Sequence, residues 1–169
     1  MRPQIGDCDR YFFTYIDKVE STDILPTLIS SIDQSIAFLE GIPAEKWDDA
    51  YAPGKWTIKE AVLHIIDTER IMAYRALRIA RGDKTPLPGF EQDDYVPYSN
   101  ANERSSASLI EEWKAVRVAT FQQFKYFTAD MWKRTGMASG HQATTLALAY
   151  IIVGHELHHL WIIRDRYLG

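Results

Sequence analysis

Four stretches of the chain space their apolar residues three and four positions apart, which is the pattern of an α-helix with one buried face. They cover residues 22–40, 57–81, 106–127 and 144–168. No stretch of comparable length alternates apolar and polar residues between turn signals, as a half-buried strand would. The pattern therefore predicts an all-α fold, and four long helices favour a four-helix bundle.

The ends of the first two predicted helices carry recognisable signals. Thr57 and Glu60 have the spacing of a capping box, which starts the second helix, and Gly82 follows its end. Pro26 is tolerated in the first helix because a first-turn residue has no intrahelical N–H bond to lose. Gly41 is expected to end that helix in a left-handed conformation.

The segments between the helices are expected to be irregular. The connection between the second and third helices is about twenty residues long, and such long segments often cover a functional site. Its turn-forming residues are Pro86, Pro88, Gly89 and Pro97. A shorter irregular stretch covers residues 136–140. Residues 1–20 form an aromatic N-terminal extension that is expected to pack on the bundle.

The composition fits one soluble domain over residues 1–169. Hydrophobic residues make up 46% of the chain and charged residues 25%, an ordinary globular balance. The net charge of -4 gives no basic field that would attract nucleic acid. Cys8 is the only cysteine, which rules out an internal disulfide and suits the cytoplasm. The N-terminal residues do not resemble a signal peptide, and the longest unbroken apolar run, 146–153, is too short to span a membrane.

Histidines cluster near the end of the chain. Because each residue of an α-helix advances about 100° around the axis, His155 and His159 project from one face one turn apart, and His158 points about 60° to one side. Isoleucines at positions 151, 152 and 162 continue much the same side, which is therefore turned toward the core. Two imidazoles in this arrangement can bind one metal ion.

A metal ion with only two protein ligands is weakly held, so a third donor is expected from another helix. His64 lies in the apolar run 61–66, and its imidazole must be largely buried. Three neutral imidazoles would leave a coordination position open, as in catalytic rather than structural metal sites. Imidazole suits zinc, nickel, copper and iron alike, so these ligands do not identify the metal.

Two carboxylates near the histidines are candidate catalytic residues. Asp67 and Glu156 could orient an imidazole or hold a proton near the ion. A solvated or ion-paired carboxylate is the alternative for both. His64 alone would more often be a core histidine bonded to a backbone carbonyl, and His155 with His159 could be a polar stripe.

The residues from His155 to His159 also match H-E-x-x-H, the signature of zinc peptidases in which the glutamate is the general base. Such enzymes take a third ligand downstream, but no histidine or glutamate follows His159. The predicted helices also offer no strand along which a peptide could extend. Peptidase activity is therefore not expected.

Three segments carry a resemblance that spans nearly the whole chain. They are Lys55 to Glu60 leading to His64, Pro88 to Asp93 in the long connection, and Gly154 to His159 near the end. In this order they resemble the DinB superfamily. The resemblance implies a four-helix bundle, commonly dimeric, that holds a divalent metal, often nickel or zinc, on the histidines at positions 64, 155 and 159. Related members include transferases that use bacillithiol or mycothiol, and a thiol-dependent isomerase.

The expected function is that of a metal-dependent enzyme acting on a small-molecule substrate. The ion would activate a low-molecular-weight thiol, as in an S-transferase, or a water. One alternative is a hydrolase in which Glu156 or Asp67 handles the proton, and another is a noncatalytic metal-binding bundle. The cavity is expected between the second and fourth helices, under the long connection, and the protein is expected to be a cytoplasmic homodimer. The residues expected to contact the substrate are Asp93, Asp94, Tyr95 and Tyr98.

Overall fold

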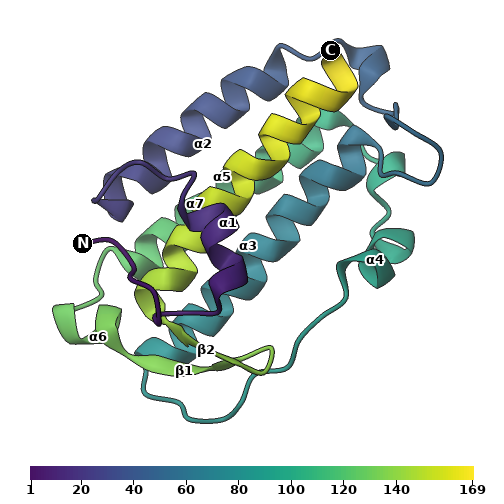
Figure 1. Cartoon of the computed structure of the whole chain (residues 1–169). Helices are drawn as coiled ribbons and strands as arrows, with labels where there is room; N and C mark the ends of the chain where they lie inside the picture. Colours follow the sequence, from purple (N-terminus) through teal and green to yellow (C-terminus); the bar gives the residue numbers. More distant parts are fainter.

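Four long helices lie side by side in the computed structural model, which describes residues 1–169 (Figure 1). They are α2 (Ile24–Glu40), α3 (Ile58–Ala80), α5 (Ser106–Phe124) and α7 (Thr145–Ile162). α3 packs against α5 and α7, and α2 packs against the same two helices. The chain is therefore mostly helical, as the spacing of its apolar residues predicted.

α7 is the core helix of this arrangement. All of its residues from Thr145 to Glu156 are buried, and the chain continues beyond it as a π-helical segment, Ile163–Leu168. The combined segment is long and apolar enough to cross a membrane, but 72% of its most apolar window is buried inside the protein. This burial is what a core helix of a soluble protein shows.

The capping box predicted for α3 is present. The Thr57 hydroxyl accepts from the N–H of Glu60 at 3.1 Å, and the Glu60 carboxylate accepts from the N–H of Thr57 at 2.8 Å. At the other end Arg81 closes the helix, and Gly82 has a φ of 83°, which glycine adopts without steric cost. The predicted start and end of this helix are confirmed.

The conformation predicted for Gly41 is wrong. Its φ is -81°, in the right-handed region. The last turn of α2 closes with two tight backbone bonds, from the N–H of Gly41 to the carbonyl of Phe38 and from the N–H of Ile42 to the carbonyl of Leu39. These bonds satisfy carbonyls at the helix end, so no left-handed residue is required there.

The stretch predicted to be irregular around residues 136–140 is a β-hairpin, which also corrects the all-α prediction. Strand β1 (Thr135–Ala138) pairs antiparallel with β2 (His141–Thr144). The two residues between the strands, Ser139 and Gly140, have φ values of 54° and 79°. Two consecutive residues with positive φ form the tight turn whose twist matches that of a hairpin.

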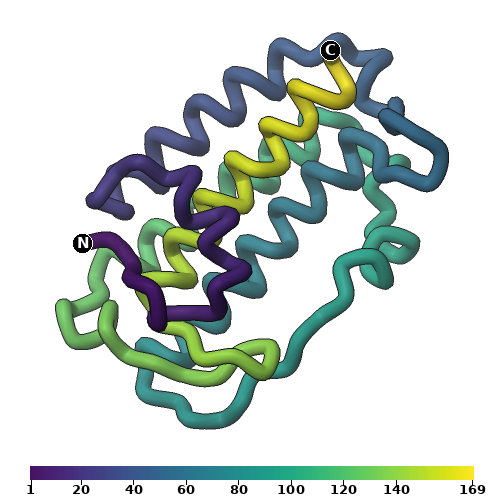
Figure 2. Tube along the Cα trace, in the orientation of Figure 1, coloured from purple at the N-terminus to yellow at the C-terminus, as the bar shows by residue number.

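The long connection between α3 and α5 is anchored to this hairpin. Leu87 exchanges backbone hydrogen bonds with Met137 and Ser139, at 2.9 and 3.0 Å. The chain then runs back along the length of the helices through the short helix α4 (Gln92–Tyr95), as Figure 2 shows. Two short 3-10 turns, Val96–Tyr98 and Ala101–Glu103, lead into α5.

The N-terminal segment lies against α7. It contains a 3-10 turn, Arg10–Phe12, and the short helix α1 (Phe13–Ile16), whose principal neighbour is α7. The contact is close at Gly154, where a Cβ would lie 2.2 Å from the carbonyl oxygen of Tyr15. Another short helix, α6 (Ala129–Lys133), precedes the hairpin.

Candidate metal centre

The three predicted ligand histidines meet between α3 and α7. The Nε2 atoms of His64 and His155 are 3.0 Å apart. One ring nitrogen from each of these two residues and from His159 can be chosen so that all three atoms lie within 4.8 Å of one another. The His155 and His159 rings, one helical turn apart, have centroids separated by 4.4 Å. The three side chains therefore form one cluster.

Aromatic rings enclose the cluster on two sides. The Trp56 ring, just before α3, lies 4.8 Å from the His64 ring and stacks beside His159 at 6.5 Å. The Tyr15 ring approaches His155 edge-on at 5.3 Å. Both residues restrict the access of water to the histidines.

Burial keeps the three imidazoles neutral. Desolvation lowers the pKa of His64 to about 4 and that of His159 to about 3, and the neighbouring histidines lower the His159 pKa further. The pKa of the buried His155 is held well below its ordinary value, first by desolvation and then by the other histidines. A neutral imidazole keeps the lone pair that metal coordination requires.

The charge state of the rings and an unpartnered ring nitrogen both indicate that the cluster fits a divalent ion. Protonated rings would repel one another at these distances, whereas a bound cation would accept a lone pair from each neutral ring. His155 is also buried with its Nδ1 atom unpartnered, so the hydrogen bonds of the protein do not account for both of its ring nitrogens. These three residues are therefore the ones that could hold a metal ion.

Glu156, one of the two carboxylates predicted to act at the ion, faces away from the histidines. Its carboxylate is completely buried and accepts hydrogen bonds from Ser31, Ser35 and Arg117, the last at 2.7 Å. Because one residue along a helix turns the side chain by about 100°, a position next to His155 points toward α2 and α5 instead. The structure therefore does not support a proton-transfer role for Glu156.

Asp67 forms an ion pair with Arg70 at 3.6 Å, as one sequence interpretation allowed. Partial burial raises the pKa of the Asp67 carboxyl group, and the charge of Arg70 opposes that effect. The charged groups that act on it are Arg70 on α3, Glu112 on α5 and Arg104 just before α5. The structure thus brings the three histidines together and leaves both predicted carboxylates outside their group.

A buried ionic network beside the cluster was not predicted. Arg117 donates to Glu69 through Nε and Nη2, at 2.8 and 2.9 Å, and to Glu156. Burial alone would lower the pKa of the Arg117 guanidinium, but the two carboxylates raise it above its ordinary value. The sequence does carry a signal of this burial. Arg117 follows Trp113 by four residues, so it falls within the apolar stripe of α5, the face that is turned to the core.

Two cavities reach the histidines. One, of about 550 Å³, includes His159 and Trp56 in its lining, and the other, of about 320 Å³, includes His155 and Tyr15. Asp93, at the start of α4, lines both. Of the other residues expected to contact a substrate, Asp94, Tyr95 and Tyr98 line neither cavity.

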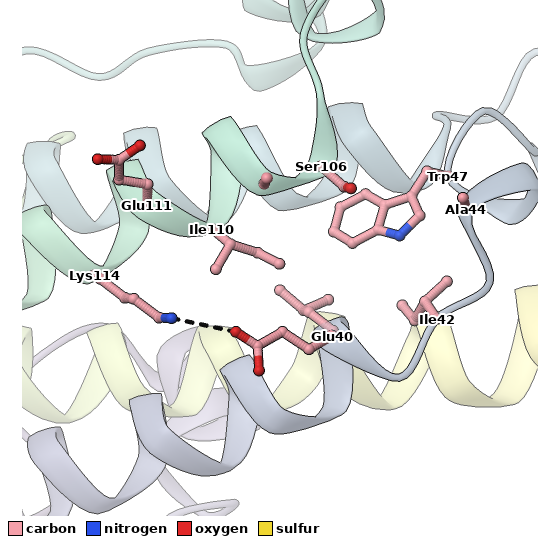
Figure 3. Close-up of a pocket in the computed structure, with 10 residues that line it drawn as sticks. Glu40, Ile42, Ala44, Trp47, Ser106, Ile110, Glu111 and Lys114 are labelled. Carbon is pink, nitrogen blue, oxygen red and sulfur yellow. Dashed lines mark hydrogen bonds and ion pairs between the residues drawn. The ribbon is translucent and has the colours of Figure 1, made fainter.

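A third cavity is remote from this chemistry. It has a volume of about 430 Å³ and lies between the end of α2 and the start of α5, where Trp47 and Ile110 face it (Figure 3). An ion pair of 3.3 Å between Lys114 and Glu40 borders it. Its lining holds no histidine, so we place the functional site at the histidine cluster.

Comparison with known proteins shows the family of this chain. A family model described as the DinB superfamily matches residues 28–163, a range that holds all three clustered histidines. The chain belongs to the DinB superfamily. No curated protein matches this DinB superfamily member.

Two solved structures show the same fold. YfiT from Bacillus subtilis, described as a probable metal-dependent hydrolase with an unusual four-helix bundle topology, has a TM-score of 0.72 at 17% identity, over 87% of this DinB superfamily protein and 89% of YfiT. A mycothiol-dependent maleylpyruvate isomerase has a TM-score of 0.66 at 12% identity, over 90% of this chain and 62% of the isomerase. At these identities the likeness concerns the fold.

Proposed function

We propose that this protein is a metal-dependent enzyme in which His64, His155 and His159 bind one divalent ion, nickel or zinc. A bound ion of this kind lowers the pKa of a coordinated water or thiol and so supplies a nucleophile near neutral pH. The substrate is a small electrophilic molecule, and the nucleophile is a low-molecular-weight thiol or water. The observation that carries the proposal is the meeting of three neutral imidazoles at two cavities.

The residues of the chain have distinct roles in this proposal. The three imidazoles, kept neutral by burial, hold the ion, and Trp56 and Tyr15 limit the water around it. Because Glu156 is committed to Arg117, we assign the acceptance of a proton from the nucleophile to Asp93 instead. It lines both cavities, and its side chain is exposed enough to exchange that proton with solvent.

A noncatalytic metal-binding bundle is the rival function. That reading requires a site closed to small molecules, since a purely structural ion is surrounded by protein ligands. The two cavities that include His155 and His159 favour the enzyme. The fold shared with YfiT and with a thiol-dependent isomerase supports both kinds of nucleophile equally.

Elemental analysis of protein purified without a His tag tests the proposed ligands. We expect one nickel or zinc per chain in the wild type and its loss in His64→Ala and His159→Ala. His141→Ala is the matched control, because His141 is an exposed histidine of the hairpin that pairs with Asp9. Full metal content in both the His64→Ala and the His159→Ala variant would reject the ligand set.

A second experiment identifies the nucleophile. The metal-loaded protein is incubated with chlorodinitrobenzene or p-nitrophenyl acetate, with and without bacillithiol, mycothiol or glutathione. Turnover that requires a thiol supports transfer, and turnover unaffected by thiol supports hydrolysis. No turnover under any of these conditions, in protein that holds its metal, would favour the noncatalytic bundle.

A further inference from the structure

Arg75, on α3, is a buried cation that no carboxylate neutralises. Its side chain donates from Nη2 to the carbonyl oxygen of Pro88 at 2.7 Å and to the Ser139 hydroxyl at 2.8 Å. Its Nη1 atom meets only the sulfur of Met72, at 3.7 Å, and its Nε atom has no acceptor. The residue is 4% exposed. Burying an unpaired charge is costly, which makes such a residue a candidate for binding an anion.

A second unsatisfied group lies on the same face of α3. Thr68 precedes Arg75 by seven residues, two helical turns. It is 3% exposed, and its hydroxyl has no hydrogen-bond partner. Both residues line the cavity of about 320 Å³ that includes His155. One cavity thus holds a buried cation with free donors, an unpartnered hydroxyl and a proposed metal ligand.

We propose that this cavity binds the carboxylate group of the substrate, through the guanidinium of Arg75 and the hydroxyl of Thr68. The inference rests on the proposed function and names its substrate class. A guanidinium presents planar N–H donors that match a carboxylate, and Arg75 retains donors that no protein oxygen occupies. The bound group would lie beside the reactive centre, because His155 shares the cavity.

The rest of the lining selects among carboxylates. Phe12, Tyr15 and Phe90 contribute aromatic rings, and Phe90 also lies 5.7 Å from the Arg75 guanidinium. These rings favour an apolar or aromatic body. Two further lining residues, Glu91 and Asp93, carry negative charge and would repel a dianion more strongly than a monoanion. The preferred ligand is therefore a small monocarboxylate rather than a dianion such as phosphate.

Arg75 also has hydrogen bonds within the protein, which would give it a structural role without any ligand. Its hydrogen bonds join the long connection, at Pro88, to the hairpin, at Ser139, and removing the side chain could loosen both. Thr68 separates the two roles, because its hydroxyl supports no contact within the protein. Thr68→Val therefore leaves the fold intact, and weakens binding only if the hydroxyl contacts a ligand.

Isothermal titration calorimetry with benzoate tests the proposal on the full-length protein, both as purified and after EDTA treatment. We expect benzoate to bind in both states, with benzamide and inorganic phosphate binding at least tenfold more weakly. Loss of one hydrogen bond in Thr68→Val should weaken benzoate binding about five- to tenfold, and Arg75→Gln should abolish it. Thr145→Val is the matched control, because it removes another buried hydroxyl without a partner, outside this cavity, and should leave the affinity unchanged.

Three results would overturn the inference. The first is binding of benzamide or phosphate as tight as that of benzoate. The second is wild-type benzoate affinity in Thr68→Val, and the third is no benzoate binding at all. Because the titration includes the EDTA-treated protein, its outcome does not depend on metal content. Stoichiometric metal in the purified protein without benzoate binding would leave the proposed function standing and reject this substrate class. Benzoate binding by a protein that holds no metal as purified would support the carboxylate site and reject the proposed metal centre.

Discussion

Two arginines are buried in this protein, and they differ in what surrounds their charge. Arg117 contacts two buried carboxylates, Glu69 and Glu156, whereas Arg75 contacts a carbonyl, a hydroxyl and a sulfur. A buried charge with a carboxylate on each side is compensated within the protein, while a charge without a counterion is available to a ligand. The same residue type therefore has a structural role in one place and a proposed binding role in the other.

Removing the charge of Arg117 should strongly destabilise the fold. Arg117→Met leaves two carboxylates buried without a cation, and breaking such a pair costs about 3–5 kcal/mol in the free energy of unfolding. Urea unfolding followed by circular dichroism measures this change. Lys114→Met is the control on the same helix, because its exposed pair with Glu40 is worth at most about 1 kcal/mol. Equal losses in the two variants would contradict the assigned role of the network.

The buried histidines make the stability of the metal-free protein depend on pH. Their pKa values are lower in the folded protein than the ordinary value of about 6.5, so the unfolded chain binds more protons below that pH. The free energy of unfolding of EDTA-treated protein should therefore fall as the pH decreases from about 7 toward 4. Urea unfolding at several pH values measures it. His64→Gln, which cannot gain a proton there, should lose less stability over this range, and an equal loss would be evidence against a buried neutral His64.

The sequence predicted which histidines meet, but not the direction of the neighbouring carboxylate. His155 and His159 are one turn apart, and His64 sits in an apolar run, so local spacing was sufficient for them. Glu156 lies on a helix that is apolar around most of its circumference, and such a helix gives no sign of which side a charge faces. Its partner Arg117 is 39 residues away along the chain, and only the packing of helices brings the two together.

At the scale of elements, strong local signals were predictive and short elements were not. The capping box of Thr57 and Glu60 fixed the start of α3, and the apolar stripes located all four long helices. The hairpin was missed because each strand has four residues, too few for an alternating pattern to stand out. The Ser139–Gly140 pair was its one local signal.

Two glycine substitutions should have opposite effects. Gly154→Ala places a Cβ within 2.2 Å of the Tyr15 carbonyl oxygen, so the N-terminal segment must move away from α7 and the protein should lose stability. Gly41→Ala adds a methyl group at a right-handed residue whose nearest neighbour would be 3.4 Å away, and should stabilise by about 0.4–1 kcal/mol. Thermal unfolding measures both changes. A neutral Gly154→Ala would contradict the close packing of α1 on α7.

At the scale of the whole molecule, the candidate site lies where the core helix α7 meets α3, the long connection and the N-terminal segment. α7 supplies two histidines from inside the fold, α3 supplies the third, and the long connection brings α4 to the rim of both cavities. Tyr15 of the N-terminal segment closes part of the remaining side. Elements far apart in the sequence therefore have to assemble before the site exists, and a stable core is a condition for its function.

The oligomeric state belongs to this scale as well. We expect a homodimer in solution, so size-exclusion chromatography with light scattering should give twice the 19.5 kDa mass of one chain. A particle with the mass of a single chain at all concentrations would contradict this expectation.

X-ray absorption spectroscopy at the metal edge of the untagged protein tests the proposed centre most directly. Three imidazole ligands at about 2.0–2.1 Å, together with one or more oxygen ligands, are the predicted first coordination sphere. The multiple-scattering signal of imidazole should weaken by about one third in any His64→Ala protein that retains metal. A spectrum with fewer than three histidine ligands in the wild type, or one unchanged by His64→Ala, would contradict a metal centre built from α3 and α7.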